Sequence, residues 1–127
     1  MAVVVEEQNL TEWRAQCGPY LGDISALCFL HLPSPNHSLP FLLAGLGSEI
    51  MVYDLDVGKV MRSFAVFQGI RVHGIASSFV EPSLIVVFGE TRVKLFSFSF
   101  DDSVPQLTLV HLLPKFGHWV LDVCFLE

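Results

Sequence analysis

Apolar residues along this chain gather in short runs, and each run ends at glycine, proline or a charged residue. Runs of this length with such boundaries are typical of β-strands. No stretch shows a sustained helical period with capping residues, so the sequence predicts an all-β protein. The expected strands cover residues 24–31, 40–45, 49–54, 59–67, 71–79, 84–89, 92–100, 106–113 and 119–126.

Turn-forming residues separate the expected strands. Residues 33–38 contain two prolines among serine and asparagine, and residues 101–105 combine two aspartates with a proline, so both segments are expected to be loops. Asp54 and Asp56 flank a tight turn that ends at Gly58. We expect these two carboxylates to accept backbone hydrogen bonds in that turn.

The order of strands repeats along the chain. Residues 24–30 match residues 120–126 in type at most positions and share the triplet Cys-Phe-Leu, while residues 72–77 form another apolar strand opening halfway between them. Equivalent strands therefore begin at 24, 72 and 120. In the second strands residues 43–45 align with 87–89, and in the third strands residues 50–53 align with 93–96. A period of 44 to 48 residues with four strands is typical of a β-propeller blade.

This repeat divides the chain into four parts. Residues 1–20 form an irregular lead-in, residues 21–68 blade one, residues 69–116 blade two, and residues 117–127 the first strand of a third blade. A blade packs on neighbours through both faces, which explains why 52% of residues are hydrophobic and only 16% are charged. Because closure takes about four blades or more, we expect the 127 residues to be part of a longer propeller.

The apolar composition does not indicate a membrane or secreted protein. The longest apolar runs are strand-sized, whereas a spanning helix needs about 20 apolar residues. The N-terminus has no basic region and no long apolar core, so no signal peptide is expected. Cys17, Cys28 and Cys124 form no Cys-x-x-Cys pair, and the last two lie in apolar runs as reduced core thiols would. The sequence therefore predicts a cytoplasmic protein with free cysteines.

The charge pattern argues against direct binding of nucleic acid. The net charge is −6, and the seven basic residues are spread along the chain. Only Arg92 and Lys94 lie close together, on one side of an expected strand. Two charges do not displace enough counterions for binding to DNA or RNA. The segment alone is therefore expected to bind proteins or to be purely structural.

No catalytic, cofactor-binding or metal-ligating residues are predicted. The five histidines lack the close spacing of zinc ligands. Ser77, Ser78 and Ser97 lie in strands without a nucleophile elbow, which weakens the alternative of a small β-rich hydrolase. Gly45-Leu46-Gly47 lacks the third glycine and the following helix of a phosphate-binding loop.

Several short motifs resemble those of the WD-repeat family. Residues 43–54 are similar to the middle of a WD repeat, with Tyr53-Asp54 in place of the closing Trp-Asp. Gly117-His118 resembles the Gly-His that precedes a blade's first strand. Blade one has Gly22-Asp23 instead, so the family's hydrogen-bonded tetrads are incomplete. The structural repeat positions that the resemblance implies are Ala44, Gly45, Tyr53, Asp54, Gly58, Gly117 and His118.

Residues 20–127 further resemble a WD-repeat subfamily that partners a tRNA ribose 2′-O-methyltransferase acting at the anticodon wobble position. The most specific elements are residues 71–75 and 86–89. The resemblance implies a cytoplasmic, non-catalytic scaffold, with S-adenosylmethionine and the chemistry supplied by the methyltransferase and tRNA bound only through the complete complex. The alternative is a general WD-repeat adaptor in ubiquitin ligation or signalling. Trp13, outside the repeat, either seals the lead-in against a blade or anchors a partner.

Overall fold

The computed structural model describes residues 23–32 and 39–126, and within them the chain is all-β, as the hydrophobic pattern predicts. Eight strands form two sheets of four. The first sheet contains β1 (Ile24–Leu30), β2 (Phe41–Leu46), β3 (Glu49–Asp54) and β4 (Lys59–Ala65). The second sheet contains β5 (Gly74–Ser77), β6 (Leu84–Gly89), β7 (Arg92–Asp101) and β8 (Val104–Leu112).

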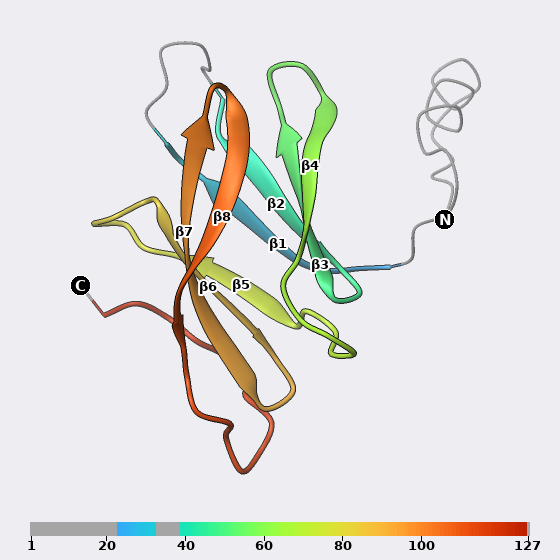
Figure 1. Ribbon diagram of the computed structural model, residues 1–127, viewed down its shortest axis with the longest axis vertical. Coiled ribbons are helices and arrows are strands. Elements are labelled where there is room, and N and C mark those ends of the chain that lie inside the picture. The colour runs from blue at the N-terminus through green and yellow to red at the C-terminus, as the bar shows by residue number, and fades with distance from the viewer. Residues whose placement is uncertain (1–22, 33–38, 127) are drawn as a thin grey trace.

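Each sheet is an antiparallel meander in which every strand pairs with its neighbours in sequence. The two sheets stack face to face, with β1 against β5 and β4 against β8 (Figure 1). The repeat therefore corresponds to two structural units of the same topology. No helix in the described part of the chain is long and apolar enough to cross a membrane.

The hairpins of the two sheets correct the expected alignment of the second strands. β2 and β3 are joined by Gly47-Ser48, and β6 and β7 by Glu90-Thr91, with a positive φ at the first residue of each turn. Superposing these turns aligns residues 43–45 with 86–88, so the expected alignment with 87–89 was wrong by one residue. A one-residue shift matters because it moves each side chain to the opposite face of the sheet.

Three expected boundaries also differ from the structure. The fifth strand is shorter than expected and begins at Gly74, because the Val72 amide donates to Gly47 in the hairpin of the first sheet and only from His73 onward does the chain bond to β6. The expected loop over residues 101–105 is a two-residue turn at Asp102-Ser103, both with positive φ, and Pro105 belongs to β8. Paired positive φ angles suit a tight hairpin. Residues 119–126 form no strand, because no described strand pairs with them.

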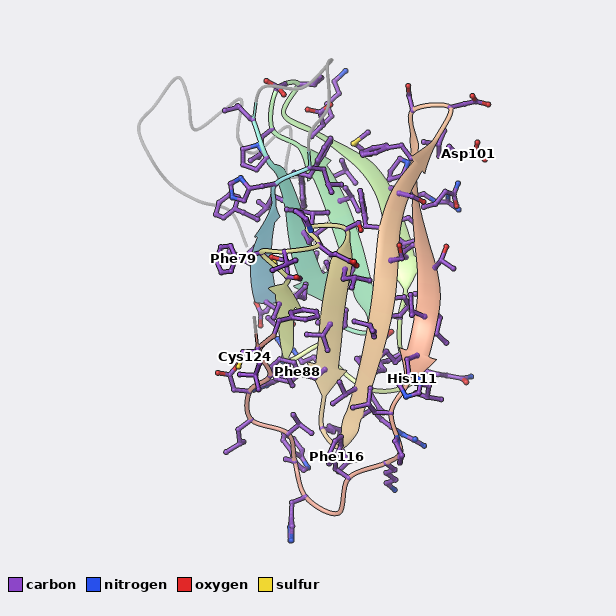
Figure 2. The ribbon with its side chains drawn as sticks, turned by 90° about the vertical axis from the view of Figure 1, so that its left-hand side faces the viewer. Phe79, Phe88, Asp101, His111, Phe116 and Cys124 are labelled. Carbon is purple, nitrogen blue, oxygen red and sulfur yellow. The ribbon has the colours of Figure 1, made fainter. Side chains whose placement is uncertain are left out.

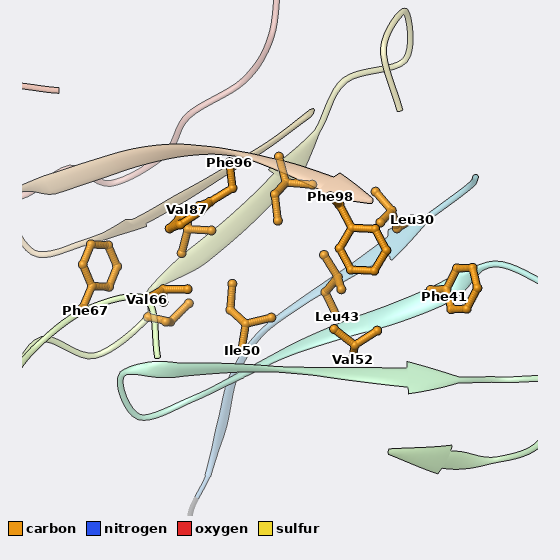
Figure 3. Packing of buried hydrophobic residues seen from close by; sticks show 12 residues of the cluster. Leu30, Phe41, Leu43, Ile50, Val52, Val66, Phe67, Val87, Phe96 and Phe98 are labelled. Carbon is orange, nitrogen blue, oxygen red and sulfur yellow. The ribbon is translucent and has the colours of Figure 1, made fainter. Parts of the chain in front are cut away.

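The main hydrophobic core lies between the two sheets (Figure 3). Alternate side chains along each strand point into it, as the period of two requires. The first sheet contributes Leu30, Phe41, Leu43, Ile50 and Val52, and the second sheet contributes Ile85, Val87, Phe96 and Phe98. Because both sheets bury their facing sides in one core, neither sheet is independent of the other.

A second, smaller core lies on the far face of the second sheet, which is the side turned away from the first sheet. Its buried residues are Val86, Phe88 and Val93. The segment after β8, residues 113–126, covers this face, with Val123 and Phe125 among the side chains that pack on it. Figure 2 shows Phe116 of this segment at the opposite end of the second sheet from Asp101. The second sheet is therefore covered on both faces.

Candidate interaction surface

The connection after each sheet is held by the same backbone hydrogen bond. After the first sheet, the Val72 amide donates to the carbonyl of Gly47 at 2.7 Å. After the second sheet, the Val120 amide donates to the carbonyl of Glu90 at 2.6 Å. Both acceptors are the first residue of the hairpin between second and third strands. Residues 72 and 120 are also the positions that the sequence repeat makes equivalent.

A second pair of hydrogen bonds repeats in the same way. The Phe67 amide donates to Ser48 at 3.2 Å, and the Phe116 amide donates to Thr91 at 3.0 Å. Each acceptor is the second residue of its hairpin. Residues 113–126 therefore pack on the second sheet in the same way as β5 and the segment before it, residues 66–73, pack on the first sheet.

Polar side chains near the interface between the sheets donate to backbone carbonyls across it. The Lys94 ammonium donates to the Val66 carbonyl at 2.7 Å and lies 5.3 Å from the ring centroid of Phe67. The Arg62 guanidinium donates to the Pro105 carbonyl at 3.1 Å, which links β4 to β8. Such charge-assisted bonds add direction to an apolar contact. Sequence analysis considered Lys94 only as a neighbour of Arg92 and missed this role, although Lys94 lies on the same side of β7 as the core residue Phe96.

Two further contacts join β1 to the second unit. The Ser25 hydroxyl donates to the carbonyl of Val72. Burial against β5 raises the pKa of the Cys28 thiol, and a hydrogen bond with Ser77 lowers it in part. A raised pKa keeps the thiol protonated and unreactive. Cys28 therefore acts as a core side chain, which agrees with its expected role as a free thiol.

The repeat positions in the first sheet lie in two places. Ala44 and Gly45 are buried in β2, and a Cβ at Gly45 would press on the side chain of Val72. Tyr53 and Asp54 end β3. One carboxylate oxygen of Asp54 accepts from the amides of residues 56 and 57 at 2.9 and 3.3 Å, which confirms its expected role in the turn.

The turn that follows β3 ends at Gly58, which has a φ of +75° and donates to the carbonyl of Asp54. Asp56 also accepts a backbone hydrogen bond through its carboxylate, from the Leu39 amide ahead of β2 at 3.2 Å. The Asp54 turn and the Leu39 segment are thereby tied together at one end of the first sheet.

The repeat positions Gly117 and His118 are exposed in the connection after β8. They line an open hollow of about 660 Å³ beside the second sheet. Trp119 also lines the hollow and is 61% exposed. Trp13, the partner anchor considered from sequence, lies outside the described residues. Sequence analysis treated Trp119 only as the start of a strand, and its exposure shows only in the structure.

The described residues offer little that resembles a catalytic or metal centre. No group of three or more histidine, cysteine or acidic residues among them could hold a metal ion. His31, His73, His111 and His118 are exposed and belong to different segments. The surface features that stand out are apolar and aromatic, which suits binding of a macromolecule.

Comparison of the sequence with protein-family models and with curated proteins gives no match. The WD-repeat resemblance therefore rests on the motifs quoted above, and the structure adds the two four-stranded units and their repeated hydrogen bonds.

Proposed function

We propose that this chain contributes two blades, and the first strand of a third, to a WD-repeat β-propeller that acts as a non-catalytic scaffold. The observation that supports it best is the repeated docking of one unit on the hairpin of the unit before it, through Val72 and Val120. Meander sheets that stack face to face through their apolar sides are the building principle of propellers. Scaffolding suits such an array because its edges and connections remain available to partners.

We further propose a specific partner, a tRNA ribose 2′-O-methyltransferase that modifies the wobble position of the anticodon. The support is the resemblance of residues 20–127 to the N-terminal part of WD repeat-containing protein 6. In this proposal the chain positions the enzyme, and tRNA binds only to the assembled complex. The net charge of −6 fits a protein-facing role better than a direct hold on phosphates.

The test is co-purification from cells that co-express the tagged chain with the methyltransferase. Nucleoside mass spectrometry then measures ribose methylation at the wobble position of tRNA. We expect the two proteins to co-purify, and methylation to exceed that obtained with the enzyme alone. Trp119→Ala is expected to weaken capture, since exposed tryptophans are common binding anchors.

The matched control is Val57→Ala, which removes a side chain of similar exposure, 61%, from the β3–β4 turn and leaves capture unchanged. Loss of capture by both variants would point to general surface effects and argue against the Trp119 anchor. If the folded chain captures neither enzyme nor tRNA, the methyltransferase partnership is wrong and only the adaptor function in ubiquitin ligation or signalling remains.

A further inference from the structure

One large apolar face of the described structure is uncovered. It is the outer face of the first sheet, the side turned away from the second sheet, formed by Leu27, Phe29, Leu42, Met51 and Tyr53. Leu27 is 58% exposed and Phe29 54% exposed, while the other three are half-buried. Alternation along the strands separates these side chains from the core-facing set. Exposed apolar faces of this kind mark binding surfaces.

The strand register shows which surface in the second sheet corresponds to this face. In the first sheet Leu27 pairs with Ala44, which pairs with Met51. In the second sheet Ile75 pairs with Val87, which pairs with Lys94. The second row belongs to the side that packs on the first sheet, where Val87 is fully buried.

The segment after β8 uses the same side for packing. By the sequence repeat Val123 and Phe125 correspond to Leu27 and Phe29, and both pack on the far face of the second sheet. Two of the three repeats therefore use this side to cover the sheet before them. The third instance is the outer face of the first sheet, and the described residues contain no preceding sheet for it to cover.

The complementary surface is the far face of the second sheet. Its core residues Val86 and Phe88 correspond by strand register to Leu43 and Gly45, on the side of the first sheet that the second unit covers. At present the far face is covered by residues 113–126, which belong to neither sheet. A four-stranded sheet offers more apolar area to this face than the single segment 119–126, so docking of a sheet is favoured as concentration rises.

We infer that two copies of this chain associate. The far face of the second sheet in one copy docks on the outer face of the first sheet in the other copy, and residues 119–126 of the copy that supplies the far face are displaced. This contact joins two different surfaces, so successive copies add head to tail. The segment 119–126 competes with the incoming copy and sets the concentration at which association begins. The inference rests on the packing of the described residues and not on the methyltransferase partnership.

The experiment is sedimentation velocity of the purified full chain over a concentration series. We expect a ladder of species that extends beyond the dimer. Leu27→Asp places a carboxylate in the contact and is expected to weaken association at least about ten-fold. Phe125→Ser, which introduces the residue found at the equivalent position 77, loosens the competing segment and is expected to strengthen association several-fold.

The matched control is Val57→Asp, which adds the same charge at a side chain of similar exposure in the β3–β4 turn, outside the strands that form the face. It is expected to leave association unchanged, and circular dichroism confirms that each variant is folded. A single monomeric species at every concentration, or equal weakening by Val57→Asp, would overturn the inference. Association that stops at a dimer and ignores Phe125→Ser would also overturn it, because it would indicate two outer faces packed on each other.

Discussion

Leu42 and Leu43 are adjacent leucines on β2 whose side chains point to opposite faces of the first sheet. Leu43 is fully buried in the core between the sheets, whereas Leu42 lies half-buried on the outer face. Truncation of each leucine to alanine therefore tests the register of β2 within one strand. We expect Leu43→Ala to destabilise the protein far more than Leu42→Ala.

The size of the effect follows from burial. Leucine to alanine removes about three carbons, each worth about 0.8 kcal/mol of transfer free energy when fully buried. Incomplete collapse of the cavity adds about 1 kcal/mol, so Leu43→Ala is expected to cost about 3 kcal/mol. Leu42 is already part-hydrated, and its truncation is expected to cost about 1 kcal/mol.

Urea denaturation followed by circular dichroism measures both costs. With a slope of about 1.5–2 kcal/mol per molar urea, Leu43→Ala should lower the midpoint by about 1.5–2 M. Hydrogen exchange should show β6 and β7 losing protection together with β2, because both sheets share one core. Equal midpoints for the two variants would refute the assignment of faces, and loss of protection confined to the first sheet would refute the shared core.

Four further outcomes follow from individual contacts. Gly89→Ala places a Cβ against the backbone carbonyl of Arg71 and is expected to cost about 1–3 kcal/mol in thermal denaturation, since backbone does not yield easily. Asp54→Ala removes the acceptor of two turn amides and is expected to cost about 1–2 kcal/mol, while Asp54→Asn, which keeps an acceptor oxygen, costs less; urea midpoints of both variants measure the difference. Burial raises the pKa of the Cys28 thiol, so alkylation followed by peptide mass spectrometry should label Cys28 more slowly than exposed Cys124. The same raised pKa means that folding favours the neutral thiol, so stability is constant at lower pH and falls as the pH rises through and above the ordinary thiol range.

Period-two alternation and turn residues were sufficient to place the eight strands, because each strand pairs with a sequence neighbour and needs no long-range information. They were insufficient where a contact between sheets decides the outcome. Residues 71–73 look like a strand, yet the Val72 amide bonds to the hairpin of the other sheet. Positive φ at Asp102 and Ser103 closes a hairpin where composition suggested a loop.

The candidate surface was harder to predict than the fold. The polar role of Lys94 depends on which carbonyl lies across the interface, and no local pattern encodes that. The exposure of Leu27 and Phe29 depends on what covers the first sheet, because the apolar residues at equivalent positions, such as Ile75 and Phe125, are partly buried against the sheet before them. Sequence alternation identifies such faces as apolar, but only the packing shows which of them is left uncovered.

The neighbour-only pairing of the strands has a consequence for folding during synthesis. Local pairing gives each sheet a low contact order, and hairpins form in about 1–10 µs. A ribosome adds about 5–20 residues per second, so the first sheet is complete for several seconds before the second emerges. During that interval the side that carries Leu43 and Val52 is as bare as the outer face. The nascent first sheet is therefore the part of the chain that needs a chaperone, and a pause in translation before β5 would prolong its exposure.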